Sequence, residues 1–129
     1  MGNADAQLEQ LLELRHRLHQ QPDLSEHEAE TARIIREFLV RCQPDEIHDG
    51  LGGHGLAAVF KSPHGPGPVV MLRAELDALP LEESIDLSWS SKNPGCAHKC
   101  GHDGHMAILA GVALRLHENP PASGSVILL

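Results

Sequence analysis

The sequence predicts an α/β domain in which helices pack on a mixed, largely parallel sheet. Two stretches near the start carry apolar residues at the three- and four-residue spacing of amphipathic helices, and four short segments with strand character follow them. A third helical pattern separates the last two of these segments. Because a helical crossover normally joins parallel strands, the last two strands are expected to run parallel.

The first two predicted helices lie close together in the chain. Leucines recur on one face of residues 8–19, and Pro22 ends this helix. A second apolar face runs over residues 32–42. Ser25 and Glu28 stand three residues apart before this face, which is the spacing of a capping box, so we expect them to cap the second helix.

The predicted strands cover residues 46–51, 56–61, 69–72 and 125–129. Residues 69–72 are uniformly apolar, so this strand is expected to be buried on both faces. The third helix is expected from about residue 104 to residue 119, between the last two strands. The stretch richest in histidine and cysteine therefore lies at the start of this helix.

Length and charge limit the function classes. At 129 residues the chain is long enough for one domain, or for a piece of one. Ten lysines and arginines stand against 18 aspartates and glutamates, which gives a net charge of −8, and tyrosine is absent. We therefore expect no nucleic acid partner. The start lacks a secretory signal and no apolar run approaches the roughly 18 residues of a membrane helix, so we expect no membrane association and a cytoplasmic location.

The three cysteines are Cys42, Cys96 and Cys100, an odd number without the spacing of a disulfide framework. Reduced thiols or metal ligands are therefore favoured over disulfides. Cys42 lies on the apolar stripe of the second predicted helix and is interpreted as a packing residue.

Residues 96–105 gather two thiols, three imidazoles and a carboxylate at the start of the third helix. Cys100 and His102, separated by one glycine, could both face one transition-metal ion, since thiolate and imidazole are typical ligands of such ions. Asp77, which follows the strand 69–72, could orient a ligand histidine by a hydrogen bond. Calcium and magnesium are less suited to this set because they prefer oxygen ligands.

Two other interpretations of the same stretch stay open. Cys96, His98, Cys100 and His102 would supply a complete Cys2His2 set for a structural zinc ion, although their alternation is tighter than the usual spacing of zinc modules. A noncatalytic binding module is the second alternative.

Three motifs of the sequence resemble those of a known family in order and spacing. They are residues 18–25 (LHQQPDLS) with Glu28 behind them, residues 72–83 (LRAELDALPLEE) and residues 98–106 (HKCGHDGHM). The family is the aminoacylase-like metallopeptidases, amidohydrolases that include hippurate hydrolase, N-acetyl-diaminopimelate deacetylase and the plant auxin-conjugate hydrolases.

The resemblance implies a metal-dependent amidohydrolase that cleaves an N-acyl amino acid or a short peptide with metal-activated water. It implies two divalent transition-metal ions, drawn from zinc, manganese, cobalt or nickel, with Cys100 and His102 among the ligands. Asp77 matches an aspartate near the metal centre, while Asp103 and His105 match motif residues without an assigned role. The resemblance also implies a homo-oligomeric full-length enzyme.

The chain departs from the family pattern in identity and in extent. Glu75 and Leu76 stand where aspartate and methionine are common, and Gln21 stands where histidine is common. The resemblance implies that residues 1–129 are the N-terminal part of a zinc-peptidase-like catalytic domain. The general-base glutamate, further ligands and a dimerisation domain would then lie beyond them. We expect the chain alone to be inactive, to bind metal weakly and to self-associate through the exposed edge of the strand 125–129.

Overall fold

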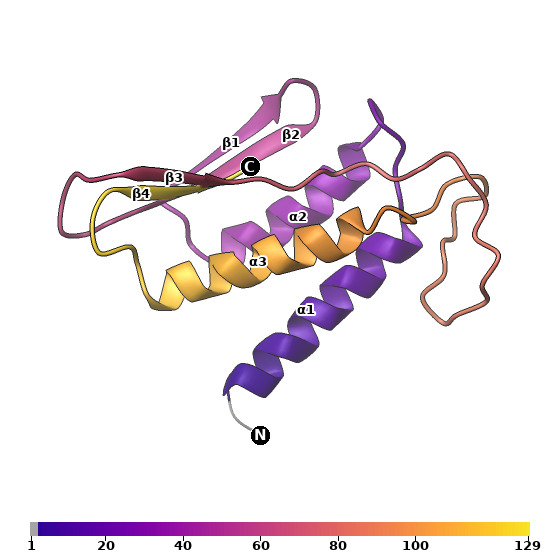
Figure 1. Ribbon diagram of the computed structural model, residues 1–129, viewed down its shortest axis with the longest axis horizontal. Coiled ribbons are helices and arrows are strands. Elements are labelled where there is room, and N and C mark those ends of the chain that lie inside the picture. Colours follow the sequence, from indigo (N-terminus) through magenta and orange to yellow (C-terminus); the bar gives the residue numbers. More distant parts are fainter. Residues whose placement is uncertain (1–2) are drawn as a thin grey trace.

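The computed structural model describes residues 3–129 as three helices and four strands (Figure 1). Residues 1 and 2 of the predicted domain lie outside the described residues. The elements in chain order are α1 (Asn3–Gln20), α2 (Ala29–Arg41), β1 (Glu46–Leu51), β2 (Gly55–Lys61), β3 (Val69–Leu72), α3 (His102–Glu118) and β4 (Ser125–Leu128). The predicted α/β class and the predicted order of elements are therefore confirmed.

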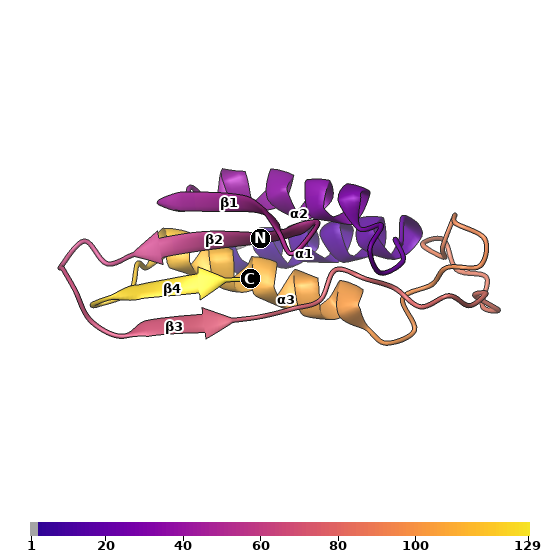
Figure 2. The same ribbon diagram turned by 90° about the horizontal axis from the view of Figure 1, so that it is seen from above.

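The four strands form one mixed sheet in the order β1-β2-β4-β3 (Figure 2). We predicted a largely parallel sheet, but within residues 3–129 only β3 and β4 pair in parallel. β1 and β2 are joined by a short turn that forces antiparallel pairing, and β2 also pairs antiparallel with β4. β3 and β4 are the strands connected through the helix α3, and their parallel pairing was predicted.

The described helices all lie on one side of the sheet (Figures 1 and 2). α2 and α3 lie next to the sheet, while α1 packs along α3 and lies farther from the strands. This arrangement brings the end of α1 close to the start of α3, although the sequence separates them by about 80 residues.

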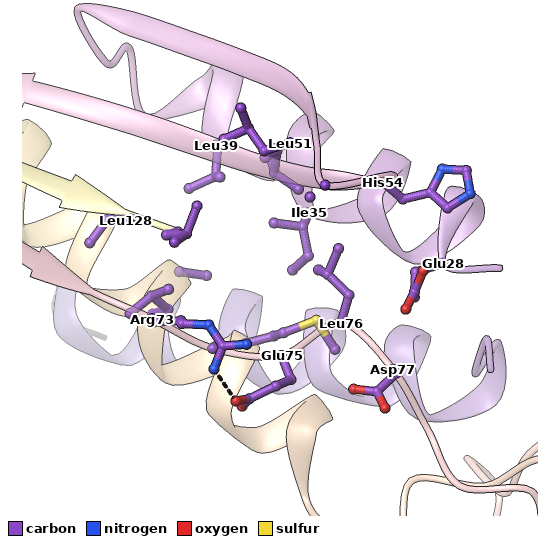
Figure 3. Close-up of a pocket in the computed structure, with 18 of the residues that line it drawn as sticks. Glu28, Ile35, Leu39, Leu51, His54, Arg73, Glu75, Leu76, Asp77 and Leu128 are labelled. Carbon is purple, nitrogen blue, oxygen red and sulfur yellow. Dashed lines mark hydrogen bonds and ion pairs between the residues drawn. The ribbon is translucent and has the colours of Figure 1, made fainter. Parts of the chain in front are cut away.

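The carboxyl ends of β3 and β4 lie at the same edge of the sheet because these strands are parallel. The segment after β3 leaves this edge and passes near the first turn of α3 (Figure 1). A cavity of about 410 Å³ opens here, between α2, the β1–β2 turn and α3 (Figure 3). Open α/β sheets place functional groups at such an edge.

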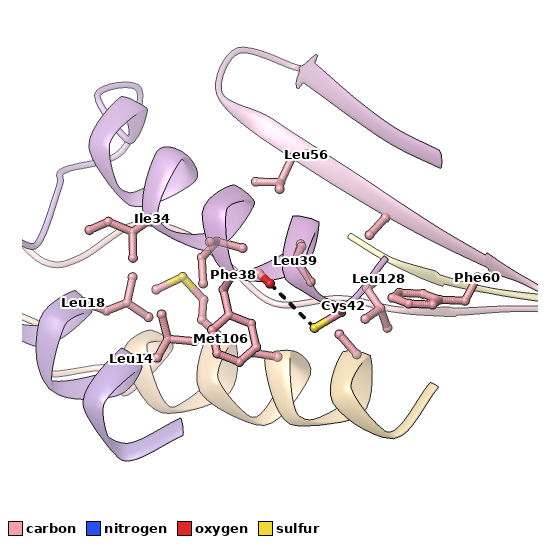
Figure 4. Packing of buried hydrophobic residues seen from close by; sticks show 14 residues of the cluster. Leu14, Leu18, Ile34, Phe38, Leu39, Cys42, Leu56, Phe60, Met106 and Leu128 are labelled. Atoms are coloured by element: carbon pink, nitrogen blue, oxygen red, sulfur yellow. Dashed lines mark hydrogen bonds between the residues drawn. The ribbon is translucent and has the colours of Figure 1, made fainter. Parts of the chain in front are cut away.

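The hydrophobic core lies between the helices and the sheet (Figure 4). Cys42 is fully buried within it, which confirms the predicted packing role, and burial raises the pKa of its thiol. On α1 the buried leucines are Leu14 and Leu18, whereas Leu8 and Leu12 of the predicted apolar face are exposed. The other large members are Ile34, Ile35, Phe38, Leu39, Leu56, Phe60, Met106 and Leu128.

The start of α2 differs from the predicted capping box. Glu28 is itself the N-cap residue and makes no side-chain capping bond. Asp23 takes that role, because its Oδ2 accepts hydrogen bonds from the backbone nitrogen of Thr31 at 2.8 Å and from its hydroxyl at 2.9 Å. The prediction was wrong because the helix begins at Ala29, later than the box requires.

Two expectations about strand environment were also wrong. β3 was expected to be buried, yet all four of its residues are exposed, from 38% at Leu72 to 65% at Val69. It lies at an edge of the described sheet, with β4 on one side only. Conversely, β4 offers no free edge for self-association, because β2 and β3 pair with it on both sides.

Candidate metal centre

The candidate site lies where the chain leaves β3 and where α3 begins. Nδ1 of His102 lies 2.8 Å from the backbone oxygen of Asp77 and 3.2 Å from its carboxylate Oδ1. A carbonyl oxygen only accepts hydrogen bonds, so Nδ1 carries the proton in this contact. Nε2 of His102 then keeps a free lone pair, which is the form that binds a metal ion.

Gly101 sets the direction of the chain between Cys100 and His102. Its φ of 87° lies in the left-handed region, which glycine adopts without steric cost. Its carbonyl accepts a hydrogen bond from the nitrogen of His105 at 3.1 Å, so α3 starts immediately after the bend. The bend separates an exposed thiol from a half-buried imidazole.

Three potential ligand atoms converge beside Asp77. Glu75, His102 and His105 each offer one such atom, and these atoms all lie within 4.8 Å of one another. Within residues 3–129 this is the one group of three or more acidic, histidine or cysteine side chains with that geometry. The rings of His102 and His105 have centroids 5.9 Å apart. We call Glu75, His102 and His105 the ligand cluster.

The structure brings together some of the predicted site residues but not all of them. His102 lies in the ligand cluster and Asp77 contacts it, whereas Cys100 is exposed and lies outside the cluster. The sequence prediction did not assign Glu75 or His105 to the metal. The available signals were spacings: Glu75 lies two residues before Asp77 on an extended segment, and His105 lies one helical turn after His102.

Glu75 is held as a carboxylate by its neighbour. Its partial loss of hydration raises the pKa, but the hydrogen bond and positive charge of Arg73 outweigh this effect, so the pKa of Glu75 lies below its ordinary value. Figure 3 shows the pair at the cavity. A carboxylate that stays ionised is available as an oxygen ligand at neutral pH.

A second polar group is built around Asp103, which directly follows His102 in the sequence. Oδ2 of Asp103 is 2.9 Å from Nδ1 of His19 and 3.2 Å from Nε of Arg15. Nε2 of His19 is 3.1 Å from Oε1 of Glu83, and Glu83 also forms an ion pair with Lys99. We call these five residues the anchor network.

The carboxylates of the anchor network are almost completely buried, with side-chain exposures of 1% for Asp103 and 5% for Glu83. The hydrogen bond from Lys99, together with bonds from Ser91 and His19, lowers the pKa of Glu83 to about 2. Burial alone would raise the pKa of Asp103, but hydrogen bonding to His19 and nearby positive charge lower it overall. Both carboxylates of the network are therefore ionised and paired within the chain.

His98 lies beside this network and is only 4% exposed. Neither of its ring nitrogens has a hydrogen-bond partner among the described residues, and the same holds for Oδ1 of Asp103. Burial lowers the pKa of His98, which favours a neutral ring. This burial was not predicted, because residue type and spacing presented His98 only as one of four possible ligands of a structural zinc ion.

The cavity at the sheet edge is lined by Glu75 of the ligand cluster and by the neighbouring Asp77. Figure 3 shows the polar Glu28, His54 and Asp77 at one end of the cavity and Leu128 at the other. Its apolar walls come from Ile35, Leu39, Leu51, Leu56, Leu76, Met106, Leu109 and Leu128. The cavity thus offers apolar surface next to carboxylate and imidazole groups.

The structure does not assemble the alternative Cys2His2 set. Sγ of Cys96 is buried and lies 3.5 Å from the backbone oxygen of Pro22, whereas Cys100 is exposed. Within residues 3–129, Cys96, His98, Cys100 and His102 do not form a convergent ligand group. A closed structural zinc site therefore has no support in this arrangement.

A divalent transition metal fits the residues that are present. The ligand cluster combines imidazole nitrogens with a carboxylate oxygen, and the Cys100 thiol lies two residues from His102. This mixture of nitrogen, oxygen and sulfur is the donor chemistry of transition-metal sites. The fixed tautomer of His102 adds to the fit, because a ligand histidine commonly donates its other N–H to a carbonyl or carboxylate.

Comparison with known proteins relates this geometry to a family. The family model described as peptidase family M20/M25/M40 matches residues 71–129, which hold Asp77, Cys100 and the whole ligand cluster. Residues 71–129 are therefore similar to a Peptidase M20 family domain. The resemblance predicted from the three motifs is thereby confirmed.

Individual relatives match more of the chain than the family model does. The chain is 41% identical to a putative amidohydrolase, YhaA, of Bacillus subtilis, over 89% of its own length and 28% of that protein. It is 39% identical to the N-acetyl-L-cysteine deacetylase of the same organism, over 93% of the chain and 29% of the relative. The chain therefore spans less than a third of the length of these curated relatives.

A solved structure supports the fold directly. The Bacillus subtilis protein YXEP, described as a dinuclear metal binding peptidase from the M20 family, superposes with a TM-score of 0.89 at 38% identity. The match covers 96% of this chain and 34% of that chain. This chain therefore has the fold of the corresponding part of that peptidase.

None of the helices among residues 3–129 is long and apolar enough to cross a membrane.

Proposed function

We propose that the protein carrying this chain is a metal-dependent amidohydrolase, which cleaves the amide bond of a small N-acyl amino acid or a short peptide with a metal-activated water. The observation that carries this proposal is the convergence of the ligand cluster beside Asp77, inside the segment that matches the M20 family model. The names of the relatives, an amidohydrolase and a deacetylase, both describe amide hydrolysis.

Cys100 and His102 are proposed as metal ligands, with Asp77 orienting His102. The contacts of Nδ1 with Asp77 leave Nε2 of His102 for the metal, and the exposed Cys100 directly precedes Gly101, two residues from His102. Glu75 and His105 lie close enough to His102 to share the site. The mixed donor set suits zinc, manganese, cobalt or nickel, and the dinuclear M20 relative supports a proposal of two ions.

Bound divalent ions supply Lewis acidity and lower the pKa of a coordinated water toward neutrality. The described residues then have defined tasks. Asp77 accepts the N–H of His102 and thereby holds the ring, while Glu75 supplies anionic charge that stays ionised because of Arg73. The general base is proposed to be a glutamate outside residues 1–129.

Residues 1–129 are proposed to form the N-terminal part of the catalytic domain, with a dimerisation domain and further catalytic segments elsewhere in a homo-oligomeric protein. The small share of each relative that the chain covers supports this proposal. A cytoplasmic location is proposed as well, and it is supported by the three cysteines of residues 3–129, all of which are free.

The test is an assay of the complete protein that carries this sequence, loaded in turn with Mn²⁺, Zn²⁺, Co²⁺ or Ni²⁺. We expect release of free amino acid from N-acetyl or N-benzoyl amino acids, and its loss in Cys100→Ser and His102→Ala. Cys96→Ala is the matched control, because this buried thiol lies outside the proposed ligand set. A protein that hydrolyses no such amide with any of the four metals would contradict the proposal.

A further inference from the structure

The two sequence neighbours of the Cys100-Gly101-His102 turn are both tied to one histidine of a distant helix. Lys99 precedes the turn and Asp103 follows it. Building on the function proposed above, we infer that His19 is a positioning residue of the metal site, which fixes both flanks of the turn through Asp103 on one side and the Glu83–Lys99 pair on the other.

The contact on the α3 side is direct. Asp103 is the second residue of α3, and its Oδ2 lies 2.9 Å from Nδ1 of His19. The carboxylate is fixed against the last turn of α1, so the backbone of His102 can shift only if this buried contact also shifts. Arg15 adds a second bond to the same oxygen from the preceding turn of α1, but its side chain is 50% exposed.

The contact on the other flank passes through Glu83. Oε1 of Glu83 lies 3.1 Å from Nε2 of His19 and is also the oxygen that pairs with Lys99. The other oxygen of Glu83 accepts a bond from the backbone nitrogen of Ser91 at 2.7 Å, which fixes the orientation of the carboxylate. Glu83 thereby provides a fixed partner for Lys99, the residue directly before Cys100.

His19 is suited to this task because it offers a polar atom on each side of one rigid ring. A neutral imidazole has one N–H and can donate to only one of the two carboxylates, whereas the imidazolium form donates to both. The side chain of His19 is 11% exposed, so little water can replace these bonds. Without His19, Asp103 and Glu83 each lose a buried partner at the same time.

The energetics favour a positioning role over a contribution to stability alone. Buried ion pairs often contribute little net stability compared with apolar residues of similar volume, because both charges lose their hydration. Metal sites, in contrast, need ligands held to within about 0.5 Å, and residues behind the ligands supply that precision. A buried network around a candidate ligand turn meets the second requirement.

Two conservative substitutions separate the two bonds of His19. In His19→Asn the amide nitrogen can take the place of Nδ1 and keep the bond to Asp103, whereas in His19→Gln it can take the place of Nε2 and keep the bond to Glu83. His16→Asn is the matched control, since His16 is on the same helix and stacks on Trp89 with ring centroids 4.3 Å apart, outside the anchor network.

The experiment measures the Kd for Mn²⁺ and Co²⁺ by calorimetry and the thermal unfolding midpoint of the metal-free state, for each variant of the complete protein. We expect metal binding to weaken about 10- to 100-fold in His19→Gln, with a smaller loss in His19→Asn. His16→Asn is expected to keep the Kd of the unchanged protein. Lys99→Met tests the other flank at a less buried position, so it remains informative if a His19 variant fails to fold.

The outcomes separate this inference from the proposed function. If the unchanged protein binds neither metal, the metal site and this inference both fail. If it binds metal and the folded His19 and Lys99 variants bind equally well, the positioning role of His19 is overturned while the metal site stands. If the Kd rises as the unfolding midpoint falls, and does so in His16→Asn as well, the network acts through stability and the inference is also overturned.

Discussion

His102 and Asp103 are neighbours in the sequence, yet their side chains belong to opposite kinds of environment. His102 lies in the half-exposed ligand cluster and keeps one ring nitrogen free, while Asp103 is 1% exposed and its Oδ2 is bonded to two α1 side chains. Both clusters contain carboxylate and histidine side chains, and the anchor network adds Arg15 and Lys99. What separates them is whether their members pair with one another.

This difference teaches how to distinguish a binding site from a structural polar cluster. In the anchor network, ion pairs and hydrogen bonds inside the chain link each of the five side chains to another member. In the ligand cluster, one potential ligand atom of each of three side chains lies within 4.8 Å of the others, and the ion pairs of Glu75 and His102 are with Arg73 and Asp77, outside the cluster. Composition alone would rank the two clusters as equals.

The largest effect is expected from removing a member of the ligand cluster. His102→Ala should lower amide hydrolysis by the complete protein about 1000-fold, because metal-ion catalysis contributes several kcal/mol to the barrier. The measurement is kcat/KM with an N-acetyl amino acid, together with the metal content of the purified protein. His54→Ala, which removes an exposed histidine of the neighbouring cavity, is the control and should keep its metal. Full activity in His102→Ala would remove the basis for treating the cluster as the site.

The next effect should be on stability and should appear in the anchor network. Asp103→Asn removes one partner of a buried charged group, which costs about 3 kcal/mol of unfolding free energy. The matched change Asp77→Asn at the more exposed aspartate of the metal site should cost less than about 1 kcal/mol. Urea denaturation of the metal-free proteins measures both. Equal losses in the two variants would show that the clusters do not differ as described.

A smaller effect should appear in the dependence of stability on pH. The pKa of Glu83 is lowered to about 2 from an ordinary value of 4.5, so its contribution to stability is present above pH 4.5 and is lost as the pH falls toward 2. The unfolding midpoint of metal-free Glu83→Gln should therefore fall less steeply over this window than that of the unchanged protein. Parallel curves for the two proteins would contradict the internal pairing assigned to Glu83.

The smallest effect concerns thiol chemistry and tests the place of Cys100. Burial raises the pKa of Cys96 and Cys42, whereas Cys100 is exposed, so one thiol per chain should react rapidly with iodoacetamide. Bound metal should slow that reaction if Cys100 is a ligand. Mass spectrometry of peptides with and without Co²⁺ measures the protection. An unchanged rate at Cys100 in metal-loaded protein would leave His102 without its proposed partner.

Local patterns predicted the elements of the fold well, because helix and strand periodicity are properties of short segments. The ranges of β1 and β3 were predicted in full, and the crossover through α3 to β4 was predicted from element order. The sheet order was not, because β4 inserts between β2 and β3 through contacts across long stretches of chain. The exposure of β3 was missed for the same reason, since its apolar composition does not say which neighbours cover it.

Prediction of the candidate site had the same limit, because contacts between distant segments could not be read from local patterns. His102 and Asp77 could be chosen from their residue types and their places after a strand and before a helix, and the structure places them in contact. The anchor network could not be found that way, because His19 and Glu83 meet Asp103 and Lys99 only after α1 packs along α3. Both ends of that network lie in motifs that carried the family resemblance, yet nothing in a single sequence states that the motifs touch.

The left-handed bend at Gly101 bears on how much of the site depends on folding. Cys100 and His102 are separated by this one residue, so they remain close in space even when the chain is unfolded. Glu75, in contrast, comes from a distant segment, and the chain must close a long loop to bring it to His102. With Cys100 and His102 as the proposed ligands, an unfolded chain would keep this pair and lose Glu75, and the gain in metal affinity on folding would measure what the tertiary structure adds to the site.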